Sequence, residues 1–249
     1  MIPNANTGQP LCRANRLVAG ALAIAVPAGF LVFFTALQVK FDYPDILRKP
    51  AAEVLARFAA SQGVLLPLWY GMFASALLFI PLSVALASLQ RTRSTVALSL
   101  AIFGAFAGLV QTIGLSRWVF AVPVLAARFA SDTSAPAQAS VTTTFDTVNA
   151  LLGVGIGEHL GYIFTTTWTL ILVWAMRGAR PISGAIGTLG AAGIAAGLLE
   201  PLGWSAAATL NALGYSLWSL WLMWLGVLLL RGRSLFSTPS DQHLAAVAG

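Results

Sequence analysis

The sequence predicts an all-α polytopic membrane protein with six transmembrane helices. Hydrophobic residues make up 58% of the chain and charged residues only 9%, whereas soluble domains carry about 25% charged residues. Six apolar segments approach or exceed the length of about 20 residues that a helix needs to cross a bilayer. Arginine pairs separate these segments in a pattern that also predicts which side each loop occupies.

The apolar segments set the predicted domain organisation. A cytoplasmic segment (1–16) precedes a six-helix transmembrane domain (17–230), and a cytoplasmic tail (231–249) follows. The first apolar run continues to Leu37, which is longer than the apolar part of a secretory signal, so we interpret it as a retained helix. The predicted spans are 17–37, 64–88, 96–120, 153–176, 182–200 and 207–230.

Basic residues predict the orientation of these spans. Cytoplasmic loops are enriched in Lys and Arg. With six spans, all four arginine pairs of the chain fall on one side of the membrane, so both termini are predicted to be cytoplasmic. The pairs are Arg13 and Arg16, Arg91 and Arg93, Arg177 and Arg180, and Arg231 and Arg233.

The outer loops differ in composition. In the first, residues 38–63, Pro50 can open a short helix, and Glu53 and Arg57 form an i,i+4 pair. An apolar side then consists of Val54, Leu55 and Phe58. This pattern predicts a short amphipathic helix on the outer surface, which is either a lid over a pocket or, as we favour, a connector resting on lipid. The second outer loop, around 128–144, is rich in Ser, Thr and Ala and is expected to be irregular at its centre.

The fourth span contains an adjacent Glu158 and His159 inside an apolar sequence. At about 100° per residue, one helix face carries Gly153, Gly157 and Gly161, and small residues at this spacing allow helices to pack closely. Similar packing is expected at Gly104, Gly108, Gly193 and Gly197. The opposite face is a polar stripe of Gly155, Glu158, His159, Tyr162, Thr165, Thr166 and Thr169. A charge at the bilayer centre costs roughly 2.5–3.5 kcal/mol or more, so this stripe should face protein or water.

Polar residues of other spans are predicted to lie at the same depth as Glu158. Counted from Arg177 along a helix, Glu158 lies about 28 Å away, near the outer boundary of a hydrocarbon core about 30 Å thick. Arg117 lies higher, where its side chain can snorkel to the headgroups. We predict an outer polar layer, which is either a ligand-binding pocket or an interfacial belt that binds nothing. Its members are Gln111, Glu158, His159, Tyr162, Glu200, Asn211 and Tyr215.

Familiar catalytic and metal-binding patterns do not occur in the sequence. The single cysteine, Cys12, cannot form an internal disulfide, and cysteine spacings typical of metal sites are absent. The patterns H-E-x-x-H, G-x-S-x-G and the phosphate-binding loop are also absent. No cofactor or metal is therefore predicted. The net charge of +6 comes from short clusters between apolar runs, which argues against nucleic-acid binding.

Four segments carry a resemblance to a known family. They are Arg16 with Ala19–Gly20, FDYPDILRKPAAEVLARF after the first span, GLSRWVFAVPVLAARF at the end of the third, and GVGIGEHLGYIFTTTWT in the fourth. The chain resembles, over roughly residues 13–230, a bacterial family of six-helix integral membrane proteins catalogued as a domain of unknown function (number four-three-eight-six). The resemblance implies this fold and a bacterial inner membrane, and it implies no reaction.

Three functional hypotheses follow from the sequence. In the first, which we favour, the protein binds or transports a small solute through an outward-facing pocket lined by the polar layer. In the second, it is a non-catalytic subunit or regulatory partner whose glycine faces dock another membrane protein or a second copy. In the third, it is an enzyme acting on lipid with Glu158 as general base; no nucleophile or metal constellation accompanies this carboxylate, so we lean away from an enzyme.

Overall fold

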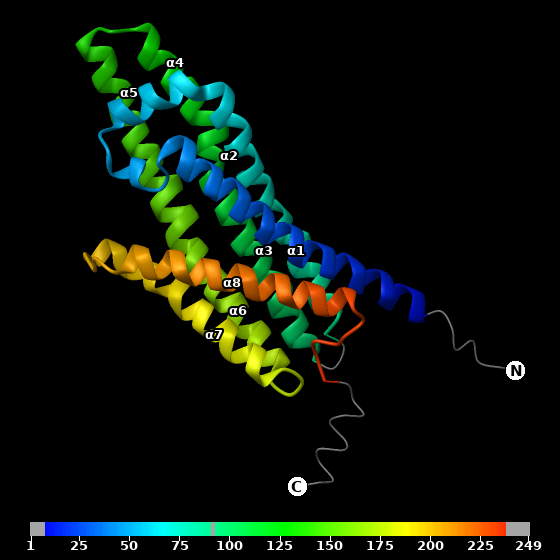
Figure 1. Cartoon of the computed structure of the whole chain (residues 1–249). Helices are drawn as coiled ribbons and strands as arrows, with labels where there is room; N and C mark the ends of the chain where they lie inside the picture. Colours follow the sequence, from blue (N-terminus) through cyan, green and yellow to red (C-terminus); the bar gives the residue numbers. More distant parts are fainter. Residues whose placement is uncertain (1–7, 91–92, 238–249) are drawn as a thin grey trace, which may run out of the picture. The chain divides into compact units, whose positions relative to one another are not determined.

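The computed structural model describes residues 8–90 and 93–237, with side chains from Arg13 onward (Figure 1). Six helical runs in this part of the chain are long and apolar enough to cross a membrane, which confirms the predicted all-α class and the six spans. Of the residues discussed from the sequence, Arg91 and the side chain of Cys12 lie outside the described part. The runs are Arg13–Phe41, Ala51–Ser88, Ser94–Ser131, Ala135–Met176, Pro181–Leu202 and Ala207–Leu230.

Two of the six runs are interrupted by π-helical segments, η2 and η3, which join α-helices end to end without a loop. They link α3 to α4 and α5 to α6. The elements in chain order are α1 (Gly8–Phe41), η1 (Asp45–Arg48), α2 (Ala51–Ser88), α3 (Ser94–Ser116), η2 (Arg117–Ala121), α4 (Val122–Ser131), α5 (Ala135–Val148), η3 (Asn149–Leu160), α6 (Gly161–Met176), α7 (Pro181–Ala196), η4 (Gly197–Leu202) and α8 (Ala207–Leu230).

The chain divides into two compact units, each made of segments that are distant in sequence. Unit 1 consists of Met1–Ala28, Leu78–Ala107 and Tyr162–Gly249, and unit 2 of Gly29–Leu77 and Gly108–Gly161. Every boundary between them falls within a continuous helical run. Each unit has its own core of buried apolar residues.

Unit 1 is held together by close helix packing and by hydrogen bonds between helices. Helices α7 and α8 run side by side (Figure 1). A Cβ added to Gly193 would lie 2.5 Å from the Cα of Gly214, so the two backbones touch there. Asn211 Nδ2 donates to the Ile194 carbonyl oxygen at 2.8 Å, which ties α8 to α7. Such glycine contacts and polar ties are the usual way helices associate in membranes.

Unit 2 has an aromatic core. The rings of Trp69 and Trp118 stack with centroids 4.5 Å apart and planes 4° apart. Phe41 meets the Trp118 ring edge-on at 5.5 Å, and Tyr43 meets Trp69 at 5.0 Å. Stacked and edge-on pairs add about 0.5–1.5 kcal/mol each beyond the burial of their surface, so this cluster contributes to the stability of unit 2.

The segment after α1 differs from the expected lipid-resting connector. The first turns of α2 are helical, as predicted, and they continue through a kink at Ser61 into the apolar part of the same helix. Val54, Leu55 and Phe58 are fully buried in the core of unit 2. The apolar side therefore rests on protein, and the interpretation as a connector lying on lipid is wrong. The large aromatic cluster beneath it provides the surface that it covers.

The loop predicted around 128–144 is much shorter than expected. Only residues 132–134 separate α4 from α5, because Pro136 can occupy the first turn of a helix and Phe145 anchors α5 in the core. The Ser134 N–H donates to Asp132 Oδ1 at 2.9 Å. This hydrogen bond lowers the pKa of the Asp132 carboxyl and fixes the turn between the two helices.

Candidate functional site

The candidate site lies where α3 and η2 pack against η3 in unit 2. A Cβ added to Gly114 would lie 2.4 Å from the Cα of Gly157, so the backbones are in contact. One turn before Gly114, the Gln111 side chain packs over Gly161. One turn after Gly114, the Arg117 guanidinium packs over Gly153. The glycines thus make room for two polar side chains between the helices.

Arg117 is buried, with 5% of its surface exposed. Its Nε donates to Asn149 Oδ1 at 3.1 Å, and its Nη1 donates to the Gly114 carbonyl oxygen. The guanidinium carbon lies 5.6 Å from the centre of the Trp118 ring, within the range of a cation–π contact. The expectation that Arg117 snorkels to the headgroups is therefore wrong: its charge is held inside unit 2 by protein partners.

Two further ionisable groups lie near this guanidinium. Both Glu158 and Tyr43 interact electrostatically with Arg117, and Glu158 and Tyr43 also interact with each other. Glu158 and its neighbour His159 are half-buried. A buried cation requires a compensating anion or several strong acceptors, and Glu158 is the carboxylate that supplies the negative charge here.

The π-helical segments bring the two hydrogen-bonded partners together. Arg117 is the first residue of η2, and Asn149 is the first residue of η3. A π-helix bonds i to i+5 and is rare, and such segments occur frequently at functional sites. The 12 residues of η3 also include Glu158. Both irregular segments therefore carry residues of the same charged cluster.

The seven predicted polar residues belong to both compact units. Gln111, Glu158 and His159 are in unit 2, and the other four, Tyr162, Glu200, Asn211 and Tyr215, are in unit 1. That all seven form one layer stays a prediction.

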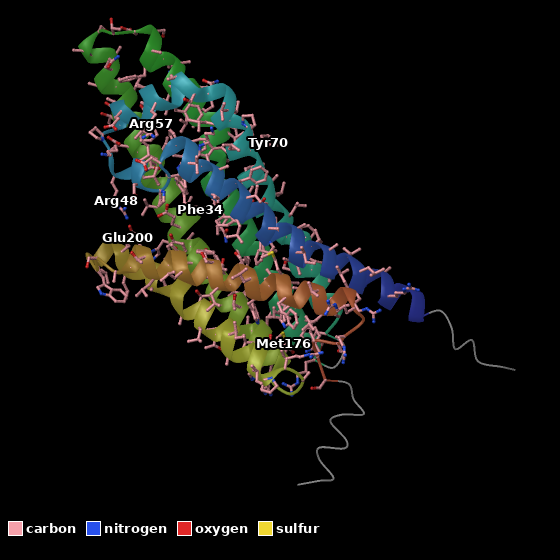
Figure 2. The ribbon with its side chains drawn as sticks, viewed as in Figure 1. Phe34, Arg48, Arg57, Tyr70, Met176 and Glu200 are labelled. Atoms are coloured by element: carbon pink, nitrogen blue, oxygen red, sulfur yellow. The ribbon has the colours of Figure 1, made fainter. Side chains whose placement is uncertain are left out.

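Within unit 1, three of the predicted residues lie close together. Tyr162 and Tyr215 have ring centres 6.0 Å apart, and Tyr162 and Asn211 both lie over Gly197. Asn211 also bonds to the α7 backbone, which is the structural role that polar residues often play between membrane helices. Glu200 is exposed and belongs to η4 (Figure 2).

The predicted packing glycines all lie in helical runs, and most contact a neighbouring helix. Gly104 faces Ser83 and Trp168. Gly108 is buried, and its carbonyl oxygen accepts a hydrogen bond from Thr112 at 2.6 Å. Gly153, Gly157 and Gly161 contact residues of their own unit, as described above. That glycine face is therefore in contact with residues of the same chain, and docking of a second protein there stays a prediction.

Several residues of this site are not among those predicted from the sequence. They are Arg117, Asn149, Tyr43 and the Trp69–Trp118 stack. The one signal that points to them is an arginine inside the otherwise apolar GLSRWVFAV, since a charge there needs a buried partner. Among the described residues, no group of three or more His, Cys, Asp and Glu side chains could hold a metal ion.

The Tyr43 phenol provides a pH test of this arrangement. Burial raises its pKa, the charge of Glu158 raises it further, and Arg117 acts in the opposite direction. In the unfolded chain tyrosine ionises near pH 10. The stabilisation from keeping Tyr43 neutral is therefore complete below about pH 10 and is lost as the pH rises towards the raised folded pKa.

As the pH rises from about 10 to about 11, we expect the stability of Tyr43→Phe to fall less than that of the wild type. Thermal unfolding of detergent-purified protein across this range measures the difference. Tyr70→Phe, which changes an exposed tyrosine of α2, is the matched control and should follow the wild type. Identical alkaline profiles for Tyr43→Phe and the wild type would contradict the raised pKa of this phenol.

The helical runs and the buried charged cluster define a multi-pass helical membrane protein. The chain belongs to the family described as Domain of unknown function (DUF4386), which matches residues 18–226. The resemblance found in the sequence is thus confirmed. No curated protein and no solved structure gives a significant match to the chain.

Proposed function

We propose that this protein binds or transports a small solute, and that the solute binds beside Arg117 and Glu158 in unit 2. We also propose that it does so in the inner membrane of a bacterium, with both termini in the cytoplasm, because of the four arginine pairs. The observation that carries the proposal is the buried Arg117 guanidinium beside a half-buried carboxylate. Ionisable residues inside a membrane are expensive and commonly mark solute or ion pathways.

The chemistry of the cluster favours a solute with acceptor oxygens, such as a carboxylate. A guanidinium carries five N–H donors and no acceptor. The indole N–H groups of Trp69 and Trp118, both fully buried, have no hydrogen-bond partner in the described part of the chain. Donors therefore predominate around Arg117. Glu158 supplies a negative charge beside these donors, so it favours a solute that also carries a hydrogen-bond donor or a positive charge.

Native mass spectrometry of mildly extracted protein tests the proposal, using wild type, Glu158→Gln and Arg117→Lys. The control is Glu53→Gln, which neutralises an exposed carboxylate in α2. We expect a small molecule bound to the wild type and to the control, with reduced occupancy in the two site variants. Tryptophan fluorescence adds a second measurement, because the Trp69–Trp118 stack adjoins Arg117.

Two results would contradict this function. One is a wild-type protein that is free of any small molecule and whose fluorescence does not change on titration with a panel of carboxylates, inorganic anions and neutral solutes. The other is a bound molecule that all three variants retain equally. Circular dichroism of each variant separates loss of binding from loss of the fold.

A further inference from the structure

The surface of unit 2 carries an apolar groove that the charged cluster does not use. It has a volume of about 640 Å³, which is within the range of about 300–1,000 Å³ found for ligand sites. The groove lies between the second half of α1 and the middle of α2. Its walls are Leu31, Val32, Thr35, Ala36, Val39, Lys40, Val64 and Leu68.

The length of the groove matches one half of a bilayer. From Leu31 to Lys40 the α1 wall advances nine residues, or about 14 Å along the helix axis. One leaflet contributes about 15 Å to a hydrocarbon core that is about 30 Å thick. Val32, Val39 and Val64 are between 53% and 75% exposed. The groove is thus open, apolar and long enough for an acyl chain of a single leaflet.

One end of the groove is charged. Lys40 lies in the last turn of α1, directly before the polar segment that leads to α2. Two arginines of that region, Arg48 and Arg57 (Figure 2), are paired with Asp45 and Asp42. Lys40 has no acidic partner within ion-pair distance in the described chain. An ammonium group that no carboxylate neutralises can bind an anion where the apolar groove ends.

We propose that this groove binds one acyl chain of an anionic phospholipid, with the lipid phosphate at Lys40. The order of the features fits this ligand: an apolar channel one leaflet long and then a cation at the polar boundary. Basic side chains at the membrane surface favour anionic lipid. The proposal does not depend on the solute site, because none of the groove residues belongs to the Arg117 cluster.

Native mass spectrometry with defined lipids tests the proposal. Delipidated protein is mixed with equal amounts of phosphatidylglycerol and phosphatidylcholine that have the same acyl chains. We expect the wild type to retain one phosphatidylglycerol in preference. Lys40→Gln should reduce this preference about fivefold, which corresponds to roughly 1 kcal/mol for one basic side chain near the membrane surface. Lys49→Gln, an exposed lysine that does not line the groove, should behave as the wild type.

A groove-filling variant tests the apolar part separately. Ala36→Phe places a ring in the groove and should reduce retention of both lipids. Val84→Phe, at an exposed position elsewhere on α2, is the matched control and should not. Equal retention of the two lipids by the wild type, equal effects of Lys40→Gln and Lys49→Gln, or a second copy of the chain in place of lipid would each overturn the proposal.

Discussion

Arg117→Met is expected to lower the free energy of unfolding by about 3 kcal/mol, the lower end of the roughly 3–5 kcal/mol seen when one member of a buried ion pair is removed. The substitution leaves Asn149 Oδ1 and the Gly114 carbonyl oxygen without their donor, and it leaves Glu158 without its nearby cation. The lower end applies because Glu158 is only half-buried. Denaturant or thermal unfolding in detergent measures the loss.

Two further variants separate charge from shape at this position. Arg117→Lys keeps the charge but not the planar fork of donors, so it should lose less stability than Arg117→Met. Combining Arg117→Met with Glu158→Gln removes both charges and should recover part of the loss, which a double-mutant cycle quantifies. Simple additivity of the two substitutions would contradict the coupling between these residues.

Gly114→Ala is expected to lower the free energy of unfolding by about 3 kcal/mol, the upper part of the range of roughly 1–3 kcal/mol for overpacked sites. The added Cβ would lie 2.4 Å from the Cα of Gly157 and 3.0 Å from the Leu152 carbonyl oxygen. Both neighbours are backbone, so they cannot rotate away as a side chain can. The two helices must separate, which also displaces Gln111 and Arg117.

Gly63→Ala is the matched control for Gly114→Ala. Gly63 also lies within a helix, and a Cβ added there meets nothing within 4 Å. Alanine is more favourable than glycine in a helix interior by roughly 0.5–1 kcal/mol, so this variant should be as stable as the wild type or more so. Comparable losses in both variants would show that the effect at Gly114 is not due to close backbone contact.

Hydropathy and charge were sufficient to predict the membrane fold. The apolar runs are long, and the cost of exposing backbone polar groups to lipid permits only helices in such a chain. The ends of the runs were less predictable. Residues 135–152 are polar enough to suggest a loop. They are helical because Phe145 packs in the core of unit 2 and because α5 continues directly into η3.

The candidate site was predicted only in part. Glu158 stands out because it interrupts an apolar sequence, and its neighbours in η3 were correctly placed on a helix. Arg117 was assigned to the headgroups because counting residues gives depth but not the direction of a side chain. Two π-helical segments alter that direction by adding residues to the turn, and nothing in the local composition indicates where they begin. Asn149 and Tyr43 could not be paired with Arg117 without the fold.

The division into two units has a consequence for how this chain can be cut and recombined. Each boundary falls inside a continuous helix, and the two units alternate along the sequence. No single stretch of the gene encodes either unit, so neither can be expressed alone as one uninterrupted fragment or exchanged between relatives as a cassette. A break at Gly161–Tyr162, for example, would create two new chain ends in the middle of a helix.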